Sequence, residues 1–206
     1  LLLNETLQSI CVQSGGKFKY SSVDRSLGSK PVKDALELLL LSGLAIKVQH
    51  SDARGKPLGA QVNSKRFKVI LLDVGLHQCI LGLDISEMIT ARGLDVVNKG
   101  ALAEVFVGQE LVAAQSNREP ASLHYWHREA RSSNAEVDYV TIYNKHVMPI
   151  EVKAGGRGSM QSIRLFMKER GLIKGLRVSL ENFAQLDNLD IVPLYAVAQY
   201  LRSDVE

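Results

Sequence analysis

The sequence lacks the features that mark several large classes of protein. No apolar run approaches the roughly 18–20 residues of a membrane-spanning helix, and the longest runs are Leu38–Leu41 and Val69–Leu72. The two cysteines, Cys11 and Cys79, are too few for a disulfide framework, and both stand among apolar residues. We therefore expect buried thiols in a reducing cytoplasm and no contact with a membrane. Without a CxxC or HExxH motif, the sequence predicts no zinc site.

The chain also lacks the GxxxxGK[ST] motif that cradles phosphates in nucleotide-binding proteins. We therefore predict that this chain does not bind ATP by itself. It opens on three leucines with no basic region before them and no small-residue cleavage site, which is typical of a helix rather than a signal peptide. It begins without Met, so we expect a fragment of a longer protein.

Charge of either sign is in only small excess. Lys and Arg number 25 against 22 Asp and Glu, a net charge of +3. Residues 1–97 hold 12 basic and 9 acidic side chains, whereas residues 98–206 hold 13 of each. An excess of three favours contact with nucleic acid but does not require it. The 46% apolar and 23% charged content is that of an ordinary globular protein.

A change of character near residues 97–99 predicts two domains, 1–97 and 98–206. In the first, apolar spacing and Gly or Pro signals predict three helices, at 1–13, 21–27 and 29–42. A hairpin follows, with strands at 44–49 and 66–73 around a polar loop at 51–64, and then a connector with one short helix at 84–95. Three helices followed by a hairpin are the order of a winged helix.

A winged helix suggests DNA binding through its third helix. Here that helix contains Leu36 and the run Leu38–Leu41, which leave little polar surface, so contact with protein ranks ahead of DNA reading. The hairpin offers more positive charge near its loop and return strand, in Arg54, Lys56, Lys65, Arg66 and Lys68. We take Arg54 and Lys56 as candidate nucleic-acid contacts.

The second segment predicts a mixed α/β (α+β) fold with a mixed central sheet. It begins with a helix at 98–114, followed by three strands at 123–126, 136–143 and 147–154. A helix at 159–170 and a strand at 176–180 come next, and a further strand at 191–197 precedes a short terminal helix. A polar loop at 128–134, a tight turn at Asn144-Lys145 and a flexible loop at 155–158 connect them.

Three acidic residues and one lysine of this segment form a candidate catalytic site. A hairpin centred on Asn144-Lys145 brings Asp138 close to Glu151, and strand alternation puts Glu151 and Lys153 on one face. Glu104 lies in the middle of the first helix and can face the same edge. Carboxylates this close repel unless a cation lies between them. We expect Glu104, Asp138 and Glu151 to hold Mg²⁺ or Mn²⁺, with Lys153 assisting a water.

At these residues the sequence resembles a known family. Glu-Val-Asp-Tyr-Val at 136–140 and Pro-Ile-Glu-Val-Lys-Ala at 149–154 are similar to the signature strands of PD-(D/E)XK, restriction-endonuclease-like proteins. The chain also resembles a domain of unknown function in the C-terminal half of prokaryotic AAA+-type ATPases. The resemblance rests on the order of these two strands with three further motifs, which are Leu-Leu-Asp-Val-Gly-Leu at 71–76, Lys-Gly-Ala-Leu-Ala-Glu-Val-Phe-Val-Gly-Gln-Glu-Leu at 99–111 and Tyr125-Trp126.

The resemblance implies a restriction-endonuclease-like αβββαβ core, and an ATPase half of the same chain that precedes Leu1 and binds ATP. Two hypotheses for function follow. In the first, the chain is a metal-dependent nuclease whose Arg128, Gln161 and Arg164 contact phosphate. In the second, it is a non-catalytic module that couples the ATPase half to DNA or to an unidentified protein. On the second hypothesis, Asp138 and Glu151 only form structural ion pairs with Lys153, Arg128 or Arg157.

Overall fold

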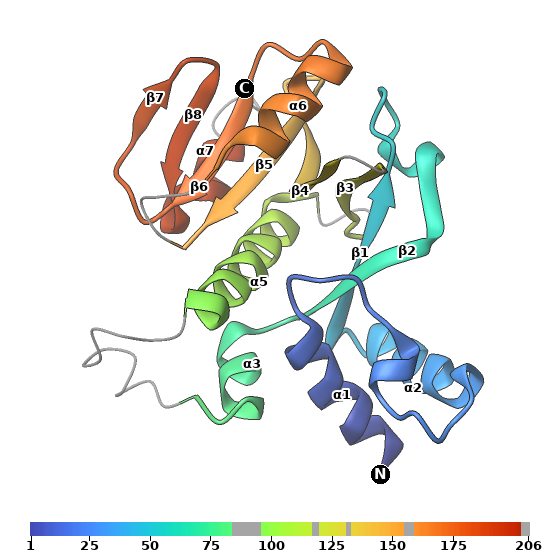
Figure 1. Ribbon diagram of the computed structural model, residues 1–206. Coiled ribbons are helices and arrows are strands. Elements are labelled where there is room, and N and C mark those ends of the chain that lie inside the picture. Colours follow the sequence, from blue (N-terminus) through green and yellow to red (C-terminus); the bar gives the residue numbers. More distant parts are fainter. Residues whose placement is uncertain (84–95, 117–119, 131–132, 155–158, 203–206) are drawn as a thin grey trace.

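A computed structural model gives the structure of the protein and describes residues 1–83, 96–116, 120–130, 133–154 and 159–202. Within them, one eight-stranded mixed sheet runs in the order β2-β1-β3-β4-β5-β6-β8-β7 (Figure 1). The strands are β1 (Ala45–Ser51), β2 (Val62–Leu71), β3 (Leu123–Ala130), β4 (Ser133–Tyr143), β5 (His146–Lys153), β6 (Gly175–Ser179), β7 (Ala184–Leu186) and β8 (Leu189–Pro193). The predicted mixed α/β class is confirmed.

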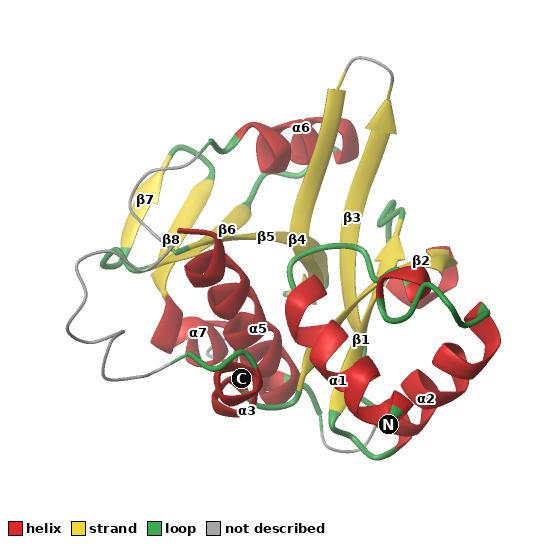
Figure 2. Ribbon diagram, turned by 60° about the horizontal axis from the view of Figure 1, so that its bottom comes forward, coloured by secondary structure: helices red, strands yellow, loops and turns green. Residues whose placement is uncertain are grey.

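Helices cover both faces of this sheet. They are α1 (Leu2–Gln13), α2 (Ser29–Leu41), α3 (Val74–Ile80), α5 (Val96–Ala114), α6 (Gln161–Arg170) and α7 (Val197–Arg202), with 3₁₀ turns at Tyr20–Ser22, Leu58–Gln61 and Leu194–Ala196. Helices α5 and α7 lie on one side of the central strands and α6 on the other (Figure 2). Each side has its own apolar core, one around Tyr139 and Ile150 and one around Val137 and Phe166.

The first and second halves of the chain share this sheet. Strand β1 pairs in parallel with β3, with Val48 opposite Leu123, so the hairpin of the first half extends the sheet of the second. Helices α1 and α2 pack on the same hairpin around a third core that includes Ile10, Leu36 and Phe67 (Figure 1). The predicted wing is therefore part of the central sheet.

Several predicted elements differ from the observed ones. The helix predicted at 21–27 is wrong, because only the 3₁₀ turn Tyr20–Ser22 forms there. The loop predicted at 128–134 is also wrong, because β3 continues to Ala130 and pairs with β4 up to Ser133. Helix α3 and strand β7 were not predicted, and the strand predicted at 191–197 ends at Pro193. The loop at 155–158 and the connector at 84–95 lie outside the described residues.

Two further expectations concern single residues and the membrane. Cys11 is buried as predicted, but Cys79 is exposed, because helix α3 turns it away from the core. Burial raises the pKa of the Cys11 thiol to about 11, so it is neutral at pH 7. None of the helices in the described residues combines the length and the apolar character needed to cross a bilayer.

Candidate active site

Glu104 is held near the sheet by the close packing of α5. The main-chain carbonyl of Glu104 accepts a hydrogen bond of 2.8 Å from the buried Tyr139 hydroxyl. One turn further, Gly108 has no room for a side chain, since a Cβ there would lie 2.4 Å from Ile70 Cδ1 and 2.5 Å from the Tyr139 hydroxyl oxygen. The missing side chain at Gly108 lets the helix approach β2 and β4, and this approach buries Glu104 to 7% exposure.

Asp138 lies where the β4–β5 hairpin opens. The two strands pair from Tyr143 and His146 to Tyr139 and Ile150, and the pairing stops one step before Asp138 and Glu151. Beyond that step β5 continues beside β6 alone. The Asp138 carboxylate crosses the opening and accepts a 2.8 Å hydrogen bond from the main-chain N–H of Val152. The predicted neighbourhood of Asp138 and Glu151 therefore exists, with a main-chain donor between the strands.

Glu151 and Lys153 form an ion pair on β5. The Lys153 ammonium lies 2.6 Å from Glu151 Oε1, and the Lys153 side chain is 27% exposed whereas that of Glu151 is 6% exposed. The second oxygen, Glu151 Oε2, is buried and has no hydrogen-bond partner among the residues that the structure describes. An unpaired buried carboxylate oxygen is unfavourable by about 1–3 kcal/mol, so this atom needs a cation or a proton.

Lys68 of β2 enters this site, although its position in the sequence suggested a surface residue. Its ammonium lies 2.7 Å from Glu104 Oε1 and 2.5 Å from Glu136 Oε1, and its side chain is 1% exposed. The ring of Tyr125 lies 5.2 Å away, within the range of a cation–π contact. Burial alone would lower the pKa of Lys68, but the charges of Glu104, Glu136 and Asp138 outweigh burial and raise it. Lys68 is therefore a charged, buried lysine.

The remaining carboxylates are short of positive charge. Burial raises the pKa of Glu104 to about 7, against the opposing effect of Lys68, and Asp138 raises it further. Burial and then the charge of Asp138 raise the pKa of Glu151 to about 7, while Lys153 opposes them. Burial likewise raises the pKa of Asp138. Among the described residues, four carboxylates thus face two ammonium groups, which is an excess of two negative charges when all are ionised.

These residues fit a divalent cation held by two carboxylates better than one held by three. In the part of the chain that the structure describes, no three His, Cys, Asp or Glu side chains converge as a ready-made metal site. The carboxylate of Glu104, an expected ligand, accepts a 2.7 Å hydrogen bond from the Lys68 ammonium instead. Mg²⁺ is commonly held by one or two carboxylates while it keeps several waters. Asp138 and Glu151 meet that requirement, with the Val152 carbonyl as a possible third ligand.

Two of the five candidate nucleic-acid contacts form ion pairs with other residues. Arg128 forms an ion pair with Glu169, and not with Asp138 or Glu151. Arg164 pairs with Asp187 at 2.7 Å, and both side chains are more than half exposed. Gln161 is exposed at the first turn of α6, and Arg54 and Lys56 are exposed on the loop between β1 and β2. Arg157 lies outside the described residues.

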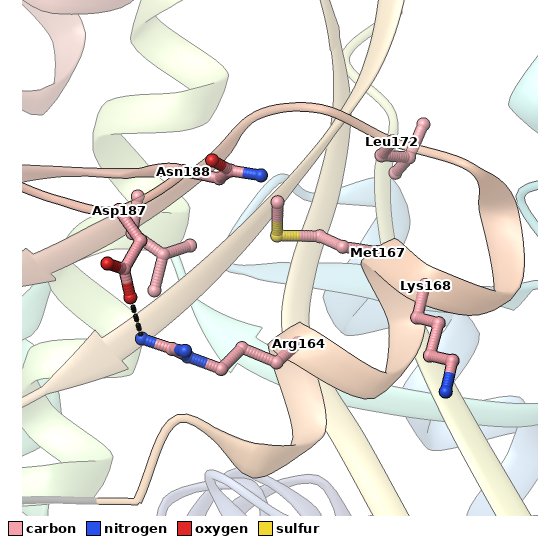
Figure 3. Close-up of a pocket in the computed structure, with 7 residues that line it drawn as sticks. Arg164, Met167, Lys168, Leu172, Asp187 and Asn188 are labelled. Atoms are coloured by element: carbon pink, nitrogen blue, oxygen red, sulfur yellow. Dashed lines mark hydrogen bonds and ion pairs between the residues drawn. The ribbon is translucent and has the colours of Figure 1, made fainter.

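A hollow of about 360 Å³ beside α6 is separate from the acidic site. Figure 3 shows Arg164 reaching across to Asp187, with Met167 above the Arg164 side chain and Asn188 and Leu172 near the top of the view. Its lining contains none of the carboxylates or lysines described above. Because the Arg164–Asp187 pair is exposed, it contributes little to stability and can exchange for other partners.

Two residues of the site were missed by sequence reasoning, Lys68 and Glu136. Strand alternation gave a usable signal for Glu136, because it stands two positions before Asp138 and so shares a face with it. Lys68 stands two positions before the buried Ile70 on β2 and so points to the core in the same way. Its positive charge, however, is the usual mark of an exposed residue.

Comparison with known proteins gives two matches, one in each half of the chain. Residues 1–87 match the family described as Domain of unknown function (DUF8612). No curated protein and no solved structure matches the chain. Residues 99–197, which carry Glu104, Glu136, Asp138, Glu151 and Lys153, match the family described as Domain of unknown function (DUF4143).

Proposed function

We propose that the second half of this chain is a divalent-cation-dependent phosphodiesterase, a nuclease of the PD-(D/E)XK type. The observation that supports it is the buried Oε2 atom of Glu151, which lacks a partner among the described residues, in a site where their carboxylates outnumber their ammonium groups by two. A divalent cation would satisfy this oxygen and neutralise that excess. The resemblance of residues 136–140 and 149–154 to nuclease signature strands supports the same chemistry.

Asp138 and Glu151 would hold the cation, Mg²⁺ or Mn²⁺, with help from the Val152 carbonyl. When bound, such an ion polarises a phosphate and lowers the pKa of a bound water. These groups lie where the pairing of β4 with β5 ends, one step beyond Tyr139 and Ile150. The hydrogen bond from Val152 N–H fixes one oxygen of Asp138, so the carboxylate keeps its orientation.

Lys153 is the more exposed of the two lysines of this site. Its ammonium contacts Glu151 Oε1, and about a quarter of its side chain is open to solvent. A lysine in this position can orient a water molecule and stabilise the negative charge that develops on a phosphate oxygen. Glu151 holds the Lys153 ammonium in place through the 2.6 Å ion pair.

Nucleic acid is the proposed substrate class, because exposed donors elsewhere on the chain could contact a phosphate backbone. Arg128 and Arg164 are paired only with exposed or half-exposed carboxylates, and such pairs exchange readily for phosphate. Gln161, Arg54 and Lys56 add exposed donors. These five residues are the proposed contacts to the nucleic-acid backbone.

The larger protein that would contain this module is proposed from the sequence. The match of residues 99–197 to DUF4143, with the motifs at 71–76 and 99–111, supports a place beside an AAA+-type ATPase half in the cytoplasm. ATP would then act only through that half.

A non-catalytic interaction module is the second candidate. The observation that favours it is that Lys68, Lys153 and the Val152 N–H already partner Glu104, Glu151 and Asp138. In that case the charged site is structural. The module would then couple the ATPase half to DNA or to a protein partner through the surfaces of α1 and α2.

Cleavage of plasmid and single-stranded DNA with Mn²⁺ distinguishes the two candidates. We expect the chain to cleave DNA and the Asp138→Ala and Lys153→Ala variants to lose that activity. Asp34→Ala and Lys33→Ala are matched controls, because both residues are exposed on α2. Equal cleavage by the site variants and the controls would assign the activity to a contaminant and leave the non-catalytic module as the better candidate.

A further inference from the structure

Lys68 brings a positive charge from the first half of the chain into the acidic site of the second half. It lies on β2, whereas its two carboxylate partners lie on α5 and β4, 36 and 68 positions later in the sequence. A lysine with a 1% exposed side chain is rare and unfavourable unless it is paired. Its burial therefore requires these carboxylates.

The main chain fixes where the Lys68 ammonium lies. Lys68 pairs with Val48 on β1, and Val48 in turn pairs with Leu123 on β3, so β2 is in register with the central strands. On the other side, Tyr139 fixes α5 at Glu104. Gly15, at the end of α1, lies against the same carboxylate, since a Cβ at Gly15 would be 3.3 Å from Glu104 Oε2. The ammonium is thus a fixed feature of the fold.

One ammonium has more carboxylates around it than a structural ion pair needs. Lys68 contacts Glu104 and Glu136 and is also within electrostatic reach of Asp138. The two carboxylate oxygens 2.7 and 2.5 Å from this buried ammonium form a position that a divalent ion could also take, since Mg²⁺ is commonly held by one or two carboxylates. Phosphodiester-cleaving sites with two metals place the two ions about 3.5–4 Å apart, and Asp138 and Glu151 both lie within electrostatic reach of Lys68 and of Lys153.

We propose that Lys68 is a built-in cation, which occupies one of two neighbouring cation positions and leaves the second, at Asp138 and Glu151, for a divalent ion. The site would then be completed only by the first half of the chain and would bind one divalent ion where a two-metal site binds two. The first position, held by Lys68, follows from the contacts alone. The occupant of the second position rests on the proposed function.

Calorimetric titration with Mn²⁺ tests this proposal, with the chain compared with the Lys68→Met variant. Methionine keeps the length of the lysine stem without its charge. We expect one Mn²⁺ per chain for the unaltered protein and two for Lys68→Met. A Lys17→Met variant is the control, because Lys17 pairs with Glu129 at the surface, and we expect it to bind one.

The outcomes separate this inference from the proposed function. If the unaltered chain binds no Mn²⁺ and Lys68→Met binds one, the built-in cation stands and the metal-dependent nuclease fails. If both bind one with equal affinity, or neither binds any, Lys68 does not occupy a cation position and the proposal is overturned.

Loss of Lys68 leaves buried carboxylates without a partner, so Lys68→Met can fail to fold. Circular dichroism of Lys68→Met with and without Mn²⁺ covers that case. Recovery of the folded spectrum on addition of Mn²⁺ supports the proposal. A variant that stays unfolded in Mn²⁺, or that folds and binds no additional Mn²⁺, overturns it.

Discussion

The Asp138 carboxylate accepts a hydrogen bond from the Val152 N–H over 2.8 Å, at the step where β4 and β5 stop pairing. It replaces the ladder hydrogen bond that β5 loses there. Asp138 therefore has two roles, one in holding the opened hairpin and one in carrying charge. A substitution that keeps the shape and removes the charge can separate the two roles.

Asp138→Asn is that substitution. The amide oxygen of Asn can still accept from Val152, so we expect the free energy of unfolding to change by less than about 1 kcal/mol. DNA cleavage with Mn²⁺ should fall by more than the roughly 10–100-fold that is typical for groups that only orient a metal ligand. Denaturant unfolding and a cleavage assay check both. Unchanged cleavage by a stable Asp138→Asn protein would remove Asp138 from the catalytic site.

Gly108→Ala tests the close approach of α5 to the sheet. The added Cβ would lie 2.4 Å from Ile70 Cδ1, and we expect a loss of about 1–3 kcal/mol in unfolding free energy. Gly100→Ala on the same helix is the control, because nothing lies within 4 Å of a Cβ there, and the better helix propensity of Ala should stabilise the protein by up to about 1 kcal/mol. Chemical denaturation measures both, and equal effects of the two substitutions would contradict the packing described for Gly108.

The raised pKa values of Glu104 and Glu151, both about 7, predict how stability depends on pH. Their ordinary value is 4.5, so between pH 4.5 and 7 the folded protein binds more protons than the unfolded chain. Linkage then makes stability fall as pH rises through this window, by at most about 1.4 kcal/mol per pH unit for each proton. The stabilisation is fully present below about pH 4.5 and is lost above pH 7.

Denaturant unfolding at several pH values between 5 and 8 measures this fall. We expect Glu151→Gln, which carries no titrating group, to flatten the dependence, and Glu37→Gln on the exposed face of α2 to leave it unchanged. Stability that rises with pH across this window, or the same slope in Glu151→Gln, would contradict the burial and repulsion assigned to Glu151.

A fragment of residues 98–206 tests whether the second half folds without the first. The fragment would lose β1, which pairs with β3, and Lys68, which neutralises Glu104 and Glu136. Breaking a buried ion pair from one side typically costs about 3–5 kcal/mol, so we expect no cooperative melting. A fragment that melts cooperatively at the temperature of the whole chain would show that the shared sheet is dispensable.

Part of the fold could be predicted from local patterns. Apolar spacing predicted α1, α2, α5 and α6, and a turn at Asn144-Lys145 gave the β4–β5 register, because these signals act between near neighbours in sequence. The polar stretch at 128–134 was taken for a loop, since its charges find partners far away in the chain. Glu129, for example, pairs with Lys17 and Arg66. Strand β7 is three exposed residues long and has no pattern to detect.

The residues of the candidate site also divide into those that local patterns predict and one that they do not. Periodicity and a turn were enough to bring Asp138, Glu151 and Lys153 together. Lys68 was taken for a basic residue of a DNA-binding wing, because its burial depends on β1 joining β3 and on carboxylates 36 and 68 positions away. No local pattern contains that information. Lys68 also donates to Glu104, which the sequence predicts as a metal ligand.

The most direct test of the central proposal is a calorimetric titration of Mn²⁺ into the unaltered chain and into Asp138→Ala and Asp34→Ala variants. The proposal predicts binding of one Mn²⁺ by the unaltered chain and by Asp34→Ala, and loss of that binding in Asp138→Ala. An unaltered chain that binds no Mn²⁺, or an Asp138→Ala variant that binds it equally well, would contradict a divalent-cation site at Asp138 and Glu151.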